Sequence, residues 1–314
     1  MTGAVAGLVM GYVLQRGQLC FHSTIAGSLA RRFTLARGWA LGVALGSVGL
    51  AILFTLPGTE ELNRGLAFRP VANVIGGLIF GVGMVVAQSC ISGLFFRLGA
   101  GMLGALVGLT GWGMGELVAR EITVPGPTLL SGGDGATLPG LFGLPRLLVA
   151  AAALAIVAIG LWRTAPRDRT SRGRGWGWAY AGIGLGVAIT AGWTLAALGD
   201  STFGPSSVGA VNSIATGSPN YWLIAFLLGI VGGAVIAART AGGFRVRGER
   251  PVRYVQLAGG GFLLGVGGWI AGGCNLGHGL SGMAQLNVSS LVVVVAMVVG
   301  VAVARRMRSR IAVG

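Results

Sequence analysis

The sequence has 314 residues, of which 54% are hydrophobic and only 10% are charged, and its mean hydropathy is +0.80. Soluble domains carry about 25% charged residues, so the composition excludes a soluble enzyme, a disordered chain and a disulfide scaffold. The net charge of +15 comes from 23 arginines and no lysine. These arginines cluster between apolar segments, which argues against a nucleic-acid-binding face and favours a polytopic membrane protein.

Long apolar segments recur along the whole chain. A helix needs about 20 apolar residues to cross a membrane. We predict nine membrane-spanning helices, at 3–19, 37–56, 71–89, 99–119, 141–162, 175–197, 221–238, 255–273 and 288–304. Together these segments predict an all-α polytopic membrane protein, with residues 1–314 forming a single transmembrane domain.

Four shorter segments follow predicted spans and are rich in Gly, Ser, Thr or Asn. They are residues 20–30, 90–98, 205–217 and 274–285. Each is too short to span a membrane and too apolar to be a plain loop. We therefore predict a short re-entrant or interfacial helix in each of the four.

The arginines give this topology an orientation. Of the 23 arginines, 18 fall in segments that the predicted topology places on one side of the membrane. Only Arg64, Arg69, Arg120 and Arg146 fall on the other side. Because arginine-rich loops stay in the cytoplasm, we predict that the N-terminus lies outside the membrane and the C-terminus in the cytoplasm.

Two distant segments resemble each other closely. The sequence GGLIFGVGMVVAQSCISG at 76–93 aligns without gaps with GGFLLGVGGWIAGGCNLG at 260–277, an offset of 184. A weaker match joins 7–11 to 182–186. The predicted topology runs the two long segments in opposite directions through the membrane. This pattern predicts an inverted pseudo-two-fold repeat, roughly 1–120 and 175–304, with the functional site near mid-membrane.

All three cysteines, Cys20, Cys90 and Cys274, stand where a predicted span gives way to a short segment. A lone cysteine in an apolar segment is usually a small buried hydrophobe, but three in the same kind of position indicate a function. A thiol is a soft, weak hydrogen-bond donor, which suits a ligand that contains sulfur. A metal ion is the competing ligand, supported by the nearby His22 and His278.

A cation pathway lacks counter-charge in this sequence, because carboxylates within the predicted spans are almost absent. We therefore predict neither a metal nor a cofactor. The sequence favours an anion as the ligand, since the starts of short helices present free backbone N–H groups and a positive dipole end. The candidate substrate-pathway residues are Cys20, Cys90, Cys274, Arg16, His22, Ser89, Ser92, Asn275 and His278.

Some of these candidates have an equally simple structural interpretation. Arg16 lies within a predicted span, four residues before Cys20, and it either contacts the anion or extends to the membrane surface. His22 and His278 either donate to the substrate or cap a short helix. We expect Cys90 and Cys274 near mid-membrane and Cys20 nearer the cytoplasmic exit.

The motifs VLQRGQLCF, GVGMVVAQSCISGLFFRLGAG and GVGGWIAGGCNLGHGLSG resemble the YeeE/YedE family of inner-membrane proteins over nearly the whole chain. The resemblance implies nine spanning helices with additional short helices in an hourglass-shaped protein. It also implies uptake of thiosulfate, which passes from one to the next of Cys20, Cys90 and Cys274. It also implies a partner, a small cytosolic sulfur-carrier protein of the TusA type. Family members often carry a second basic residue where this chain has Gln18. The weaker repeat has an offset of 175 residues, which makes Leu195 the equivalent of Cys20. The repeat therefore has four equivalent positions, of which three are cysteines and the fourth is not.

Two alternatives remain open at this point. The transported compound could be another sulfur or selenium compound, which other branches of the family handle. The chain could also be a membrane enzyme that forms a cysteine persulfide from thiosulfate and releases sulfite, although we favour a transporter over an enzyme. No GxxxxGK[ST] motif is present, so direct coupling to ATP is not expected.

Overall fold

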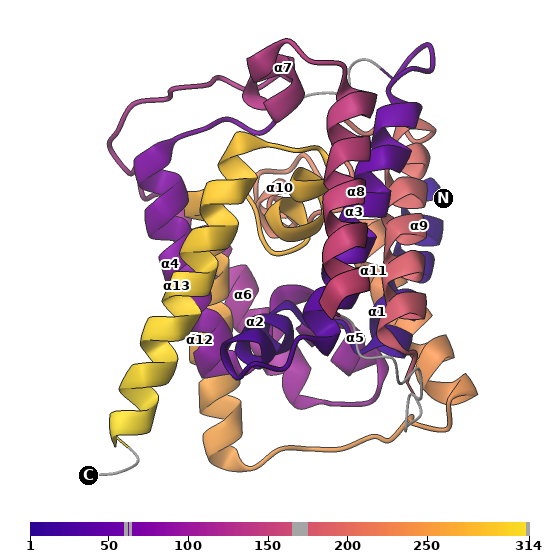
Figure 1. The fold of residues 1–314 in the computed structure, drawn as a ribbon. Helices are drawn as coiled ribbons and strands as arrows, with labels where there is room; N and C mark the ends of the chain where they lie inside the picture. Colours follow the sequence, from indigo (N-terminus) through magenta and orange to yellow (C-terminus); the bar gives the residue numbers. More distant parts are fainter. Residues whose placement is uncertain (60–61, 63–64, 165–174, 312–314) are drawn as a thin grey trace.

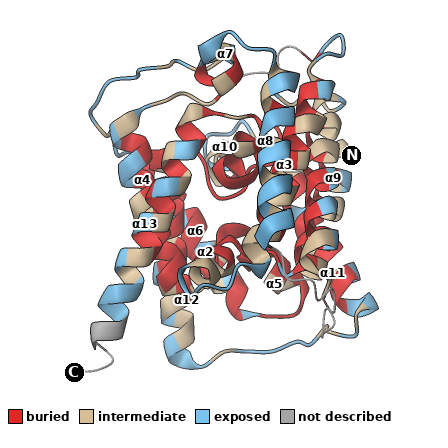
Figure 2. Ribbon diagram, viewed as in Figure 1, coloured by how far each residue is buried: buried red, intermediate tan, exposed pale blue. Residues whose placement is uncertain are grey.

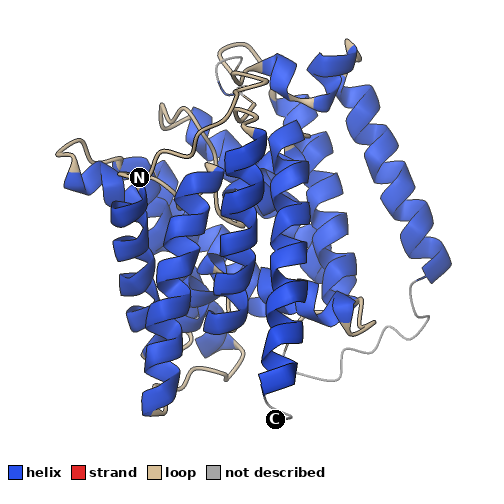
Figure 3. Ribbon diagram, turned by 90° about the vertical axis from the view of Figure 1, so that its left-hand side faces the viewer, coloured by secondary structure: helices blue, strands red, loops and turns tan. Residues whose placement is uncertain are grey.

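A computed structural model describes residues 1–59, 62, 65–164 and 175–311. The described chain is helical, apart from three isolated β-bridges, and its long helices lie side by side (Figures 1 and 3). The long helices are α1 (Thr2–Gly17), α3 (Thr34–Leu53), α4 (Pro70–Ala87), α6 (Gly104–Ala119), α8 (Arg146–Thr164), α9 (Trp178–Ala197), α11 (Tyr221–Thr240), α12 (Pro251–Ala271) and α13 (Val288–Ile311). The short helices are α2 (Phe21–Leu29), α5 (Ile91–Gly99), α7 (Leu138–Phe142), α10 (Ala210–Ala215), the 3-10 helix η2 (Asp134–Ala136) and the π-helix η3 (Gly277–Gly282).

The predicted spans coincide with the long helices, and the four predicted short segments contain α2, α5, α10 and η3. Within the described ranges, seven helices are long and apolar enough to cross a membrane. The helices α1 and α6 have 16 residues each and are shorter than these seven. An all-helical membrane protein with several spans is thus confirmed, while nine spans stay a prediction. Most of the predicted arginine-rich loop at 163–174, and Arg64, lie outside the described residues.

The long helices form two groups. In one group α1 packs against α9 and α11, and α3 packs against α8 and α9. In the other group α12 packs against α4 and α6, and α13 packs against α4. The short helices α2 and α5 join the groups, because α2 contacts α3 and α13 while α5 contacts α6 and α11 (Figure 1). Buried residues concentrate in this central region (Figure 2).

Helix α8 stands at the edge of the protein. Ala150 is the one buried residue of this helix, and Figure 3 shows α8 apart from the other long helices. Its exposed side chains include Leu148, Ile156 and Trp162. A helix with so much exposed apolar surface is stable where that surface meets lipid, which agrees with a membrane span.

The helices α4 and α12 cross through glycines in a reciprocal manner. A methyl group on Gly76 would overlap the backbone of Ala271, and a methyl group on Gly260 would overlap the backbone of Ala87. In the repeat with an offset of 184 residues, Gly76 is equivalent to Gly260 and Ala87 is equivalent to Ala271. The contact of Gly76 with Ala271 is therefore equivalent to the contact of Gly260 with Ala87, with the two helices exchanged. Such exchange is what a two-fold related pair of helices shows. The inverted repeat of the whole chain stays a prediction.

The ends of the same two helices are held in a matching way. Asn73, in the first turn of α4, donates from Nδ2 to the carbonyl of Ala271 at the end of α12, at 2.8 Å. Arg253, in the first turn of α12, donates to the carbonyl of Ala87 at the end of α4. Each side chain satisfies a carbonyl group that a helix end leaves without a partner. Both helices can therefore stop inside the protein, where the cysteines follow.

Candidate functional site

The three helices that precede the cysteines end in the same way. Their last turns close with a residue in the left-handed conformation, at Gln18 (φ 50°), Gln88 (φ 47°) and Gly272 (φ 79°). The N–H of the following residue then bonds to the carbonyl five positions back, as Leu19 does to Leu14. This is a Schellman motif, which turns the chain sharply away from the helix axis. A cysteine follows two residues after each left-handed residue.

The thiols of Cys20 and Cys90 are in contact. Their Sγ atoms lie 3.5 Å apart, and these two residues cap the first turns of α2 and α5. The N–H of Phe21 donates to Cys90 Sγ at 3.3 Å, and the N–H of Gly93 donates to the same sulfur at 3.4 Å. The N-terminal ends of two helices therefore converge on one sulfur atom, and both present positive dipole ends to it. Cys20 is thus in direct contact with Cys90, and its expected place nearer the cytoplasmic exit stays a prediction.

Gly93 allows this approach of the two thiols. A Cβ at this position would lie 3.0 Å from Cys20 Sγ and 3.3 Å from Cys90 Sγ. Any side chain larger than hydrogen would thus press against both sulfur atoms. The glycine of the CISG motif is therefore explained by the close packing of α5 against the two cysteines.

A line of polar contacts leads from Cys90 to Cys274. Ser92 Oγ lies 3.3 Å from Cys90 Sγ, and Asn275 donates from Nδ2 to Ser92 Oγ at 2.8 Å. Cys274 precedes Asn275 in the chain, and Ser207 donates to Cys274 Sγ at 2.9 Å. Cys90, Ser92, Cys274 and Asn275 are completely buried. We name the set Cys20, Cys90, Ser92, Asn275 and Cys274 the cysteine row.

Four of the predicted residues lie outside the cysteine row. Ser89 donates its hydroxyl hydrogen to the carbonyl of Cys90 at 3.1 Å. His278 lies 2.9 Å from Ser290 Oγ through Nδ1 and 3.0 Å from the carbonyl of Ala271 through Nε2, so it connects α12 to α13. His22 lies on α2, and its buried Nδ1 has no hydrogen-bond partner in the described part of the chain. The fourth is Arg16, whose guanidinium lies over the ring of Trp176, 5.9 Å from the centroid.

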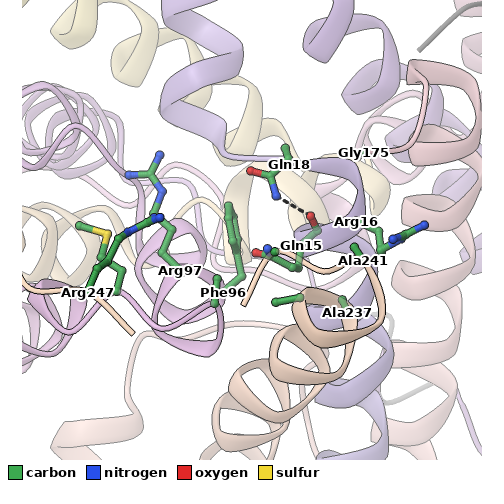
Figure 4. Close-up of a pocket in the computed structure, with 13 residues that line it drawn as sticks. Gln15, Arg16, Gln18, Phe96, Arg97, Gly175, Ala237, Ala241 and Arg247 are labelled. Carbon is green, nitrogen blue, oxygen red and sulfur yellow. Dashed lines mark hydrogen bonds between the residues drawn. The ribbon is translucent and has the colours of Figure 1, made fainter. Parts of the chain in front are cut away.

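A cavity of about 530 Å³ lies at one end of the bundle. Arg16, Arg97 and Arg247 line it together with Gln18, and we name it the arginine cavity. Figure 4 shows Arg97 and Arg247 on one side of this cavity and Arg16 on the other. Gln18 is two residues from Cys20, and Arg97 lies on the helix that Cys90 caps. The arginine cavity therefore adjoins the Cys20 and Cys90 end of the cysteine row.

A second cavity, of about 390 Å³, lies at the other end. Its lining includes Thr202, Ser206, Gly272 and Gly277, and we name it the serine cavity. Gly272 and Gly277 flank Cys274 in the chain. Among the described residues, no cysteine lines either cavity. The cysteine row is therefore closed from both cavities in this conformation.

Two residues of this region were not among the predicted candidates. Ser207, which contacts Cys274, lies in the 205–217 segment, where a run of proline and serines precedes α10. Glu116 on α6 is completely buried and accepts through Oε1 from the N–H groups of Gly209 at 2.9 Å and Asn212 at 3.1 Å. Glu116 thus holds the segment that presents Ser207 to Cys274.

No group of three His, Cys, Asp or Glu side chains is placed to hold a metal ion within the described ranges. The polar groups that gather here are instead thiols, hydroxyls, an amide and backbone N–H groups. These groups can donate to an anion. A buried polar row between two cavities, inside a bundle of apolar helices, defines a membrane transport protein.

The sequence model of the sulphur transport family matches residues 16–303, and the chain belongs to this family. The membership confirms the resemblance to the YeeE/YedE proteins. The chain is similar to the thiosulfate transporter TsuA of Spirochaeta thermophila, with 32% identity over 95% of this chain and 96% of that protein. It is also similar to the thiosulfate transporter TsuA of Escherichia coli, with 26% identity over 96% of this chain and 92% of that protein. The protein is accordingly a transporter and not an enzyme.

Proposed function

We propose that this protein takes up thiosulfate across the bacterial inner membrane through the cysteine row. The side-chain contacts that link Cys20, Cys90, Ser92 and Asn275 carry the proposal, together with the buried Cys274, which adjoins Asn275 in the chain. Both relatives described above are named thiosulfate transporters. The names support thiosulfate as the substrate, and the row supplies a route for it.

The groups of the row suit both ends of thiosulfate. The terminal sulfur of this dianion is soft and accepts weak hydrogen bonds from thiols, whereas its oxygens accept stronger bonds from N–H and O–H groups. Transferring an unpaired charge out of water costs tens of kcal/mol, so many donors must share the stabilisation. The N-terminal ends of α2 and α5 converge at Cys90 and provide fixed positive dipoles at that point.

The two cavities give the route its direction. In the topology that we propose, with nine spans in an inverted repeat, the arginine cavity faces the cytoplasm and the serine cavity faces outward. Thiosulfate then enters at the serine cavity, passes Cys274, Cys90 and Cys20, and leaves beside Arg97 and Arg247. Since the row is closed in this conformation, passage requires the helices around it to move.

The arginine cavity also provides a place for the cytosolic partner. Thiosulfate that leaves the row meets the guanidinium groups of Arg16, Arg97 and Arg247, which retain an anion near the exit. A small sulfur-carrier protein of the TusA type would collect the substrate there. His22, Ser89 and His278 border the row and, in this proposal, support its walls.

Another sulfur or selenium compound is the alternative substrate, because a selenium analogue would meet the same soft donors. Growth separates the two. A bacterial strain without thiosulfate uptake should grow on thiosulfate as the sole sulfur source when it makes this protein. The same strain with Cys274→Ala should not grow on thiosulfate but should grow on cysteine. Absence of growth with the unmodified protein, although it is present in the membrane, would contradict thiosulfate as the substrate.

A further inference from the structure

The helix α9 ends in the same way as the three helices that precede the cysteines. After α9, Asp200 adopts the left-handed conformation with φ 51°, close to the 50° of Gln18. The next residue, Ser201, donates its N–H to the carbonyl of Ala196, five positions back. The same relation holds from Leu19 to Leu14 after α1. This is the same Schellman motif as after α1, α4 and α12, and it also closes other helices of the chain, among them α2 at Arg31 and α5 at Gly101.

The predicted repeat aligns 7–11 in α1 with 182–186 in α9, so it selects the end of α9 as the counterpart of the end of α1 that precedes Cys20. Each cysteine stands two residues after the left-handed residue, and the residue in that place after Asp200 is Thr202. The sequence offset had pointed instead to Leu195. Leu195 lies within α9 and is therefore not equivalent to a residue that follows a helix.

Thr202 differs from the cysteines in its surroundings. It is exposed and lines the serine cavity, whereas the three cysteines are buried. No short helix begins at the next residue, since α10 starts only at Ala210. The hydroxyl of Thr202 has no hydrogen-bond partner among the described residues. A donor of this kind, on the wall of a polar cavity, is free to bind a ligand.

The segment that carries Thr202 leads directly to the cysteine row. Ser206 also lines the serine cavity, and Ser207 donates to Cys274 Sγ at 2.9 Å. One short stretch of chain thus places hydroxyl groups from the open cavity to the first buried thiol. A hydroxyl is a stronger donor than a thiol and suits the oxygens of an anion that is still partly hydrated.

We propose that Thr202 is the fourth substrate-contacting residue of the series and binds the thiosulfate anion in the serine cavity before it reaches Cys274. This inference rests on the proposed function and adds a residue that selects oxyanions at the entrance. In this inference, the residue after α9 binds the hydrated substrate in the cavity. The cysteines after α1, α4 and α12 contact the substrate as it passes through the buried row.

Kinetics of labelled thiosulfate uptake test the role of the hydroxyl. Thr202→Val removes the hydroxyl at nearly constant volume and should raise KM roughly tenfold, because it deletes a hydrogen bond to a charged group. The maximal rate should change little, and Thr202→Ser should restore KM. The control is Thr216→Val, since Thr216 is exposed on the neighbouring turn and bonds to the carbonyl of Asn212.

A chemical block gives a second, independent readout. In Thr202→Cys, reaction with a membrane-impermeant maleimide, followed by removal of the reagent, should abolish uptake, whereas the untreated variant should transport. Treated wild-type protein and treated Thr216→Cys should keep their activity. Unchanged KM in Thr202→Val, or full activity of the labelled Thr202→Cys, would overturn the inference while leaving thiosulfate transport intact. No uptake by the wild-type protein would overturn the proposed function and the inference together.

Discussion

Cys20 Sγ lies 3.5 Å from Cys90 Sγ, although the two residues are 70 positions apart and cap different helices. Both helices start at this point, so backbone N–H groups and thiols converge in one place. The pair is buried and reduced. The contact makes the start of α5 a junction between the two groups of long helices, because α2 also packs against α3 and α13.

Oxidation should link this pair selectively. With copper phenanthroline as the oxidant, the two thiols lose two protons and two electrons and form a disulfide, whose S–S bond is about 2.05 Å long. We expect a Cys20–Cys90 cross-linked peptide in mass spectrometry and loss of uptake that dithiothreitol reverses. Cys274→Ser should still form the link. A cross-link from Cys274 to Cys20 in place of this one would contradict the arrangement.

Ser92 connects Cys90 to Asn275, so its removal should interrupt the row. In Ser92→Ala, the amide of Asn275 loses its partner, and an unsatisfied buried polar group costs about 1–3 kcal/mol. We expect thiosulfate uptake to fall roughly tenfold, since about 1.4 kcal/mol corresponds to a factor of ten. Ser28→Ala is the control, because the Ser28 hydroxyl lies outside the row and donates to the carbonyl of Thr24 on α2. Equal rates for the two variants at matched expression would count against the row.

The crossing of α4 and α12 offers a stability test with neighbouring residues. Gly260→Ala places a methyl group against the backbone of Ala87, and overpacking of this kind costs about 1–3 kcal/mol. Gly259→Ala meets open space within 4 Å and should be neutral or slightly stabilising. The midpoint of thermal unfolding in detergent should therefore fall by about 5 °C for Gly260→Ala alone. Equal midpoints for the two variants would refute the close crossing.

Glu116 should hold the segment before α10 in place. Glu116→Ala leaves the N–H groups of Gly209 and Asn212 without their acceptor, at about 1–3 kcal/mol for each buried group. Hydrogen exchange of residues 207–215 should become at least tenfold faster. Glu121→Ala is the control, since the side chain of Glu121 is 74% exposed in its ion pair with Arg120, and exposed pairs contribute little. Unchanged exchange in Glu116→Ala would show that the carboxylate does not anchor this segment.

Hydropathy located the long helices well, because nine apolar segments separated by arginines leave few other arrangements. The same holds for the short segments, whose Gly, Ser and Asn content marks the interruptions. The short helix α7 was not predicted, since Leu138–Phe142 straddles the start of the predicted span 141–162 and carries no period of its own. Some helices begin or end a few residues away from the predicted bounds. Helix α12, for example, begins at Pro251, whereas the predicted span begins at residue 255.

The site was predicted less completely, because backbone geometry decides which residues meet. Positive φ at Gln18 and Gln88 is uncommon for residues other than glycine, so the common turn before the cysteines was not visible in the sequence. The offset of the weaker repeat leads to Leu195, which lies within α9, because a constant offset ignores differences in helix length. Contacts such as Ser207 with Cys274 join distant segments, and no local pattern predicts them.

Uptake of thiosulfate into liposomes that contain only the purified protein tests the central claim most directly. The substrate should carry a different isotope label on each of its two sulfur atoms, with an inward concentration gradient as the driving force. We predict that both labels enter in equal amounts with the wild-type protein, and that Cys90→Ala and Cys274→Ala reduce entry to the level of empty liposomes. Entry at the wild-type rate in both variants, or entry of only one label, would contradict passage of intact thiosulfate along the cysteine row.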